Sequence, residues 1–165
     1  MLMKLIVFAA FLLAWAGILA LRRARLRRGA SVVIDGSNLL YWRNETPDLA
    51  PLRALIARLE AERRRPVIWF DANAGYLIAG HYMGEAAFAR ALGLPRKQVF
   101  VAPKGTPADP LILQTAAALS ARIVTNDRYR DWRESHPILN DPNRLIRGRW
   151  QDGALILARD LADAA

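Results

Sequence analysis

Four aspartates stand where apolar segments end or where helices are expected to begin, namely Asp35, Asp109, Asp127 and Asp131. In a parallel α/β sheet the carboxyl ends of the strands meet at one crevice, so we expect these side chains to converge there. Carboxylates that lie close together repel one another, and such a cluster persists mainly when it holds hard divalent cations. The pattern therefore favours a metal-dependent enzyme that acts on phosphodiester bonds.

The first two aspartates also suit purely structural roles. Asp35 follows an apolar run and precedes GSN, and Asp, Ser and Asn are common in turns. Asp109 precedes Pro110, so it is expected to be the N-cap of a helix with the proline at its first position. Asn38 would supply a neutral oxygen to a metal, orient Asp35, or cap the segment that follows. These roles are compatible with a metal site, because a capping carboxylate can also face a crevice.

The last two aspartates are four residues apart, so both would lie on one face of a helix that begins at Asp127. Like charges at that spacing are mildly destabilising without a cation. Neutralisation by the arginines between and beside them is the structural alternative. The residues that flank the proposed site are also candidates for contacts with the substrate and its phosphate groups. They are Lys104, Asn126, Arg128 and Arg130.

The composition and the missing motifs exclude several other chemistries. With no cysteine, the chain has no disulfide, no thiolate zinc site and no cysteine nucleophile. Its two histidines leave little scope for a histidine-rich metal site. The sequence contains no GxxxxGKS/T, GxGxxG or GxSxG pattern, which argues against a nucleoside triphosphatase, a dinucleotide enzyme and a serine hydrolase.

The N-terminus has the pattern of a membrane anchor. Residues 5–21 form an uninterrupted run of 17 apolar or small residues, which as a helix would measure ~25 Å, near the lower limit for a bilayer. Five arginines follow within residues 22–28, and the positive-inside rule then places everything after them in the cytoplasm. We expect a transmembrane anchor over residues 1–21, a basic arm over 22–30 and a folded domain over 31–165.

Much of the positive charge belongs to this N-terminal region. The formal net charge of the chain is +9, but without Lys4 and the five arginines of the arm it has 18 Lys and Arg against 15 Asp and Glu. The arm is therefore expected to contact the inner, cytoplasmic surface of the cell membrane. The remaining domain is only mildly basic, so charge alone does not establish nucleic-acid binding.

Strand-like and helix-like segments alternate along the rest of the chain. Apolar runs predict strands at 31–35, 66–70, 98–103 and 122–127, and helical patterns occupy 49–65, 81–93, 108–121 and 128–135. Residues 144–157 read as a terminal hairpin around QDG. Such alternation predicts a mostly parallel sheet with helices on both faces, an α/β fold of three layers.

At these residues the chain resembles the NYN branch of the PIN-like nucleases, and in particular the Regnase-type ribonuclease domain. The matching pieces are VVIDGSNLL, the helix start at Asp109 and IVTNDRYRDW, in that order, and RLIRGRWQDGALIL resembles the closing hairpin of that family. The resemblance covers about residues 31–157. It implies a three-layer α/β/α PIN-like domain.

The resemblance also implies a Mg²⁺- or Mn²⁺-dependent endoribonuclease that acts on single-stranded RNA. Carried over by position, its acidic centre would consist of Asp35, Asn38, Asp109, Asp127 and Asp131. The chain departs from the family at residue 108, where Ala108 stands in place of a second acid, and between residues 71 and 93, which match poorly.

The departure at residue 108 supports an alternative of a different class. A membrane-tethered module that binds RNA or docks a protein, with a weak or inactive metal site, would keep the fold while losing part of the acidic centre. The sequence leaves open the RNA target, the number of metals and whether the domain forms a homodimer.

Overall fold

The computed structural model of this chain describes residues 30–159 and 161. The division of the chain into two units falls after Ala30, so nearly all of the described residues belong to the second unit, which begins at Ser31. The expected anchor over residues 1–21 and almost all of the basic arm lie outside the described residues. Within the described part, no helix is both long and apolar enough to cross a bilayer.

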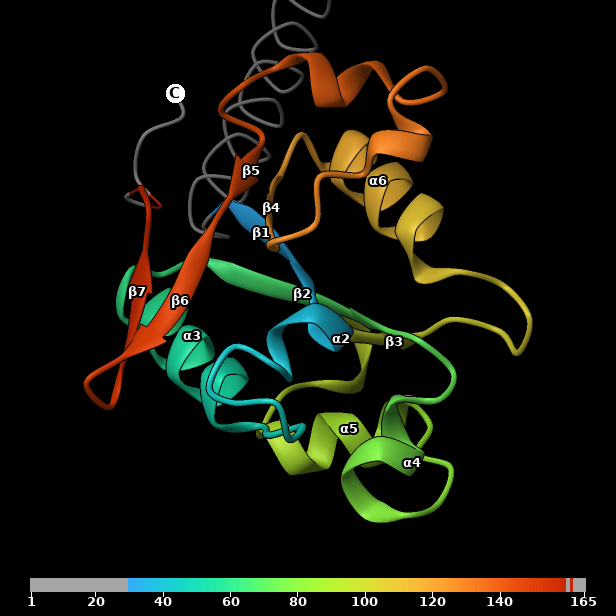
Figure 1. Cartoon of the computed structure of the whole chain (residues 1–165), viewed down its shortest axis with the longest axis vertical. Coiled ribbons are helices and arrows are strands. Elements are labelled where there is room, and N and C mark those ends of the chain that lie inside the picture. Colours follow the sequence, from blue (N-terminus) through green and yellow to red (C-terminus); the bar gives the residue numbers. More distant parts are fainter. Residues whose placement is uncertain (1–29, 160, 162–165) are drawn as a thin grey trace, which may run out of the picture. The chain divides into compact units, whose positions relative to one another are not determined.

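A five-stranded parallel sheet forms the centre of the second unit, with the strand order β3-β2-β1-β4-β5 (Figure 1). In register, Ile34 of β1 lies between Ile68 of β2 and Val124 of β4. The predicted parallel sheet is therefore confirmed, and it has one more strand than expected. The strands are β1 (Ser31–Asp35), β2 (Arg65–Phe70), β3 (Val99–Val101), β4 (Arg122–Val124) and β5 (Leu145–Ile146).

Helices cover both faces of the sheet, because neighbouring residues of its strands point to opposite sides and both sets are apolar. Val32 and Ile34 belong to a core cluster with α3 (Ala50–Ala61) and α5 (Glu85–Leu92). Val33 belongs to a second cluster with α6 (Ala108–Leu119). Figure 1 shows α3 and α5 on one side of the sheet and α6 on the other.

Two short helices follow strand ends of the sheet. Helix α2 (Gly36–Leu39) follows β1 directly, and α4 (Ala74–Ala79) follows β2 after three residues. A Cβ at Gly36 would lie 2.6 Å from a ring carbon of Phe70 and 2.7 Å from the carbonyl oxygen of Trp69. Glycine therefore permits the chain to turn into α2 against the neighbouring strand.

The helix expected over residues 128–135 is not present. Its place is taken by a turn and a short 3-10 helix, η2 (Arg130–Trp132). The Asp127 carboxylate accepts the Tyr129 backbone N–H at 2.7 Å, and Tyr129 adopts a left-handed backbone with φ of 48°. This local hydrogen bond competes with the first turn of an α-helix, so the expectation that helix geometry aligns Asp127 with Asp131 is wrong.

The terminal hairpin is confirmed over residues 148–157, as a separate two-stranded antiparallel sheet of β6 (Gly148–Gln151) and β7 (Ala154–Leu157). Residues 145–146, which were expected to belong to it, instead form β5 of the parallel sheet. Asp152 and Gly153 have φ values of 51° and 79°. Two consecutive positive φ angles match the twist of a two-residue hairpin turn. Two further 3-10 helices, η1 (Arg96–Gln98) and η3 (Pro137–Asn140), complete the fold.

Candidate active site

The candidate site lies where the connections of the sheet reverse direction. From β1 the chain builds β2 and β3 on one side, then crosses back to build β4 and β5 on the other. In open α/β sheets, ligands bind in the crevice outside the carboxyl ends of the strands at such a switch point. Asp35 is the last residue of β1 and lies next to this crevice.

Three donors hold the buried carboxylate of Asp35. Its Oδ1 accepts the Asn38 backbone N–H at 3.1 Å and so caps α2, as the turn interpretation predicted. Its Oδ2 accepts the hydroxyl protons of Thr125, at 2.9 Å, and Tyr129, at 3.1 Å. The donors come from both β1–α2 and the segment after β4, so the carboxylate joins the two sides of the switch point.

The position of Asp35 perturbs its ionisation. Burial is the largest effect and raises the pKa of this carboxyl group from 3.8 to about 6. The three hydrogen bonds oppose that rise, and the negative charge of Asp109 adds to it. Burial and the charge of Asp35 also raise the pKa of Tyr129 above its usual value, so its hydroxyl stays protonated.

Asp109 reaches the same site from the first turn of α6. The prediction that Asp109 is the N-cap is wrong, because the helix begins at Ala108 and Pro107 occupies the cap position. The cap acceptor comes from another strand end: Oδ1 of Asp71 accepts the Ala108 backbone N–H at 3.2 Å. The Trp132 indole N–H donates to Asp109 Oδ2 at 3.1 Å and so connects η2 to the start of α6.

Asp109 feels the charges of several other acidic side chains. Burial raises the pKa of this half-buried carboxyl group, the Trp132 hydrogen bond opposes the rise, and the charges of Asp127, Asp71 and Asp131 add to it. Asp127 and Asp131 are themselves exposed. The four predicted aspartates, together with Asp71, therefore share one electrostatic environment.

No basic side chain neutralises this group directly. In the part of the chain that the structure describes, none of the ion pairs involves Asp35, Asp71, Asp109, Asp127 or Asp131. The alternative that Arg128, Arg130 and Arg133 pair with the acids thus has no support among residues 30–159 and 161. An uncompensated cluster of carboxylates is a favourable environment for a divalent cation.

The chemistry of the acidic group fits Mg²⁺ or Mn²⁺, which prefer oxygen ligands. Asp109, Asp127 and Asp131 each retain a carboxylate oxygen without a donor among the described residues. No three acidic or histidine side chains within this described part have the spacing of a preformed metal site. Mg²⁺ commonly uses only one or two carboxylates and completes its shell with waters and substrate phosphate, so such a preformed set is not required.

Asn38, a predicted metal ligand, and Asn126, a predicted substrate-binding residue, hydrogen-bond to other parts of the protein. Asn38 Oδ1 accepts the Trp42 indole N–H at 2.8 Å and the Asn126 backbone N–H at 2.9 Å, which uses both of its lone pairs. Asn126 pairs with both backbone groups of Gly148, at 2.9 and 3.2 Å. These amides position the segment after β4 and do not offer a free oxygen to a metal.

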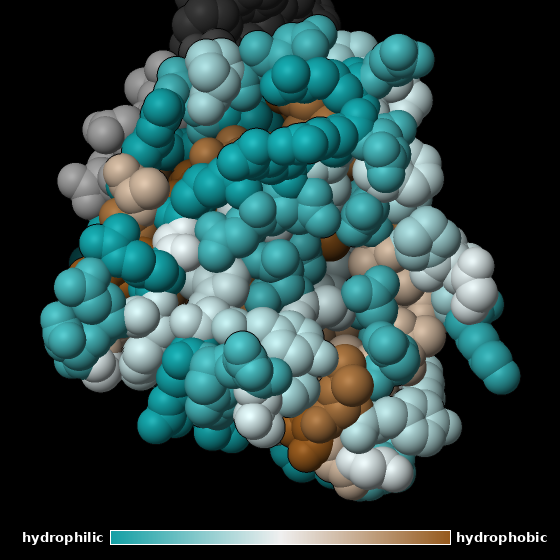
Figure 2. All heavy atoms as spheres, viewed as in Figure 1, coloured by the Kyte–Doolittle hydropathy of each residue, from teal (hydrophilic) through white to brown (hydrophobic). Residues whose placement is uncertain are grey.

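The predicted phosphate-binding residues lie in two separate pockets. Lys104 lines a pocket of about 490 Å³ beside the ends of β2 and β3. Arg128 and Arg130 line a pocket of about 360 Å³ with Arg133 and Arg147. Figure 2 shows that hydrophilic side chains cover most of this face of the molecule, with an apolar patch toward α4 and α5.

Over residues 28–161 the chain matches the family described as the Zc3h12a-like Ribonuclease NYN domain. This chain belongs to that family. The resemblance carried by VVIDGSNLL and IVTNDRYRDW is thereby confirmed. No curated protein matches the NYN domain chain in sequence.

Two solved structures of a plant enzyme share the fold of this NYN domain. Nuclear protein-only RNase P 2 of Arabidopsis thaliana is 19% identical with a TM-score of 0.59, and the alignment covers 95% of this chain and 36% of that one. A crystal structure of nuclear proteinaceous RNase P 2 from the same plant is 18% identical with a TM-score of 0.54, over 78% and 29% of the two chains. The NYN domain chain thus spans about a third of their length.

Several residues of the NYN domain site were missed by sequence reasoning. Thr125 and Tyr129 hold Asp35, and Trp132 holds Asp109. The sequence places all three near predicted acids, but it shows neither the left-handed turn at Tyr129 nor the tertiary contacts of these side chains. Asp71 is recognisable from the sequence, because it directly follows an apolar strand and is therefore expected either to line the crevice or to cap the loop that follows; the structure shows it as the cap of α6.

Proposed function

We propose that this NYN domain is a divalent-metal-dependent endoribonuclease that hydrolyses phosphodiester bonds in single-stranded RNA. The observation that carries the proposal is the group of carboxylates without a basic partner at the switch point of a ribonuclease-family sheet. Asp35, Asp109, Asp127 and Asp131 are the residues proposed to hold Mg²⁺ or Mn²⁺. When bound, such an ion supplies activation of a water nucleophile and neutralisation of charge on the phosphate.

The side chains of the NYN domain have distinct parts in this proposal. Asp35 is proposed to be the most firmly positioned metal ligand, because the hydroxyl groups of Thr125 and Tyr129 restrain one of its oxygens. Thr125 also accepts the Asp127 backbone N–H at 3.0 Å, so the same hydroxyl links two of the acids. Lys104 on one side and Arg128 and Arg130 on the other are proposed to bind the RNA backbone through its phosphates.

We also propose that the chain is anchored in the cell membrane by residues 1–21, with the NYN domain in the cytoplasm. The support is the sequence pattern alone: an apolar run of 17 residues followed at once by five arginines. This localisation would confine cleavage to RNA near the inner membrane surface.

The test uses the full-length protein and a 5′-labelled single-stranded RNA. We expect cleavage in Mn²⁺ or Mg²⁺, none in EDTA, and loss of cleavage in Asp35→Asn and Asp127→Asn. Asp152→Asn is the matched control, because Asp152 is an exposed aspartate in the β6–β7 turn. Cleavage that persists in EDTA or in Asp35→Asn would overturn the proposed mechanism.

An inactive RNA-binding module is the second candidate, and Ala108 beside Asp109 is the observation in its favour. Its side chain is buried, with an exposed fraction of 2%, and Asp109 is the one acidic residue in the first turn of α6. Tight RNA binding by the wild-type chain, without cleavage in either metal, would favour this candidate over the enzyme.

A further inference from the structure

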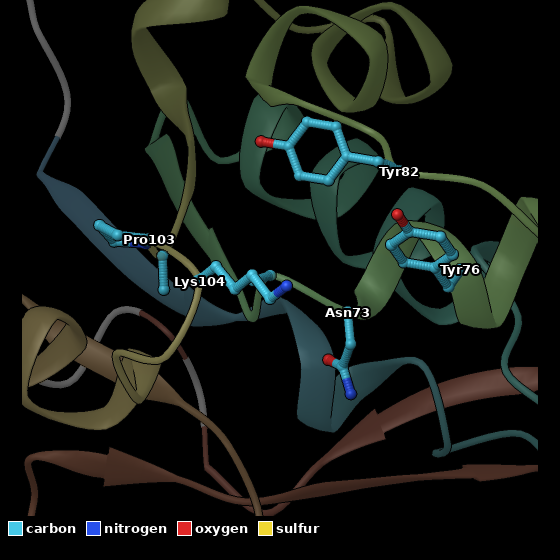
Figure 3. Close-up of a pocket in the computed structure, with 7 residues that line it drawn as sticks. Asn73, Tyr76, Tyr82, Pro103 and Lys104 are labelled. Atoms are coloured by element: carbon cyan, nitrogen blue, oxygen red, sulfur yellow. The ribbon is translucent and has the colours of Figure 1, made fainter.

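The pocket that contains Lys104 is bordered by the two residues that directly follow Asp71. It is lined by Ala72, Asn73, Tyr76, Tyr82, Ala102, Pro103 and Lys104. Its volume of about 490 Å³ is within the range of small-molecule sites. Figure 3 shows the rings of Tyr76 and Tyr82 on one wall, while Lys104 extends from the opposite loop toward Tyr76 and Asn73.

The two tyrosines are unusually exposed for aromatic side chains. Tyr76 and Tyr82 are 57% and 58% exposed, the highest values among the large hydrophobic side chains in residues 30–159 and 161. Two accessible rings in one pocket provide flat surfaces on which a planar group can stack. Base–aromatic stacking of this kind is a main source of affinity for unpaired nucleic acid, and it tolerates any base.

Close backbone packing places the tyrosines together. Tyr76 lies on α4, and Tyr82 lies on the segment that folds back over this helix. A Cβ on Gly75 would lie 2.4 Å from the Met83 backbone nitrogen and 2.9 Å from the His81 carbonyl oxygen. Glycine at this position therefore allows the segment with Tyr82 to lie directly against α4.

The pocket residues lie close in sequence to two of the acids, Asp71 and Asp109. Ala72 and Asn73 follow Asp71, whose carboxylate accepts the first N–H of α6. Lys104 lies in the loop that leads from β3 to Asp109. A nucleotide in the pocket would thus be close to a phosphate at the acidic group, with the lysine charge available to the intervening backbone.

We propose that this pocket binds one unpaired nucleobase of the RNA strand, next to the phosphate that is cleaved. The base stacks on Tyr76 and Tyr82, Lys104 binds an adjacent phosphate, and the Asn73 amide contacts the edge of the base. This inference rests on the proposed ribonuclease function and adds to it a subsite for single-stranded substrate. A base held in a duplex is not free to enter the pocket, so the site selects unpaired RNA.

The test measures RNA binding separately from cleavage. A short fluorescein-labelled single-stranded RNA is titrated in EDTA with the full-length wild type, Tyr76→Ala/Tyr82→Ala and Tyr76→Phe/Tyr82→Phe. Leu77→Ala is the matched control, because Leu77 is 45% exposed on the same helix but does not line the pocket. We expect affinity to fall about 10-fold or more in the alanine double variant, and to be retained in the phenylalanine variant and the control.

A second readout locates the base directly. RNA that carries 5-iodouridine forms photochemical cross-links to stacked aromatic rings, and we expect the cross-linked peptide to contain Tyr76 or Tyr82. Wild-type affinity of the alanine double variant, or cross-links confined to other aromatic residues, would overturn the base pocket. Metal-dependent cleavage of the same RNA by the wild type separates that failure from failure of the proposed function: cleavage would continue in the first case and be absent in the second.

Discussion

Burial and the neighbouring charge of Asp109 make ionisation of Asp35 costly, and its three hydrogen-bond donors offset only part of that cost. Its exposed fraction is 6%, and burial raises its pKa to about 6. A shift from 3.8 to about 6 corresponds to about 3 kcal/mol of destabilisation at pH 7. A cost of this kind is typical of residues retained for function, because a neutral side chain would give a more stable fold.

The first prediction concerns Asp35→Asn. Because folding raises the pKa of the Asp35 carboxyl group, its protonated form favours the folded state, and this contribution is fully present below about pH 4. The contribution is lost as the pH rises through about 6. The variant should therefore be more stable than the wild type at pH 7 in EDTA, by about 1 to 3 kcal/mol, and should lose most of this advantage at pH 4. Denaturant unfolding at the two pH values measures the difference.

The same variant should lose metal-dependent cleavage. An amide retains the oxygen for the Asn38 N–H but removes the charge proposed to hold the cation. Asp152→Asn serves as the control for both measurements. A variant that is less stable than the wild type at pH 7, or that cleaves RNA at the wild-type rate, would contradict this assignment.

At the scale of the elements, the strand ends and the helix starts hold one another in place. Asp71 at the end of β2 caps α6, and its own backbone N–H donates to the Ser37 hydroxyl in α2 at 2.8 Å. The first turn of α6 carries Asp109. The position of one proposed metal ligand therefore depends on an aspartate that need not bind the metal itself.

Two substitutions of Asp71 distinguish its role as the cap of α6 from the effect of its negative charge. Asp71→Ala removes the acceptor for the Ala108 N–H and should cost about 1 kcal/mol of stability, with slower cleavage because Asp109 is less well positioned. Asp71→Asn retains an acceptor oxygen, so its stability should stay close to the wild type. Thermal unfolding and cleavage rates of the two variants test this, and equal losses in both would contradict the capping role.

Gly36 controls how β1 leads into α2. Because a Cβ would approach a carbonyl oxygen of β2 at 2.7 Å, Gly36→Ala forces the backbone to shift and should cost about 1 to 3 kcal/mol. The shift should also reduce cleavage, since Asp35 and Asn38 flank the glycine. Denaturant unfolding together with a cleavage assay measures both effects. Wild-type values in both would show that the contact is easily relieved.

The sequence predicts the layers of this fold better than its connections. The apolar runs at β1, β2 and β4 and the face of α3 formed by Leu52, Leu55 and Ile56 are confirmed, because periodicity follows burial. The Asp127–Asp131 helix was wrong, because a side-chain hydrogen bond to the Tyr129 backbone determines that segment. For Asn38 the residue type leaves a ligand, an orienting group and a cap all open, and only the family resemblance implies a ligand, whereas tertiary hydrogen bonds to its oxygen decide its role.

At the scale of the whole molecule, charge divides between the N-terminal arm and the NYN domain. Five arginines lie within residues 22–28, and without them and Lys4 the chain has 18 basic against 15 acidic residues. A nearly balanced domain cannot rely on long-range attraction to capture RNA at physiological salt. Local basic pockets beside the acids are then expected to provide most of the electrostatic binding.

The last prediction is that residues 1–28 carry the localisation. A reporter enzyme fused after Ala165 should be active in the cytoplasm, and the fusion should remain in the membrane fraction after carbonate extraction. Deletion of residues 1–28 should release it, because the apolar run and the arginines that orient it are both removed. Replacement of the five arginines by glutamine is the matched control: the apolar run still inserts, but the orientation becomes mixed. Digestion of the intact fusion by protease added outside the cell would contradict the predicted topology.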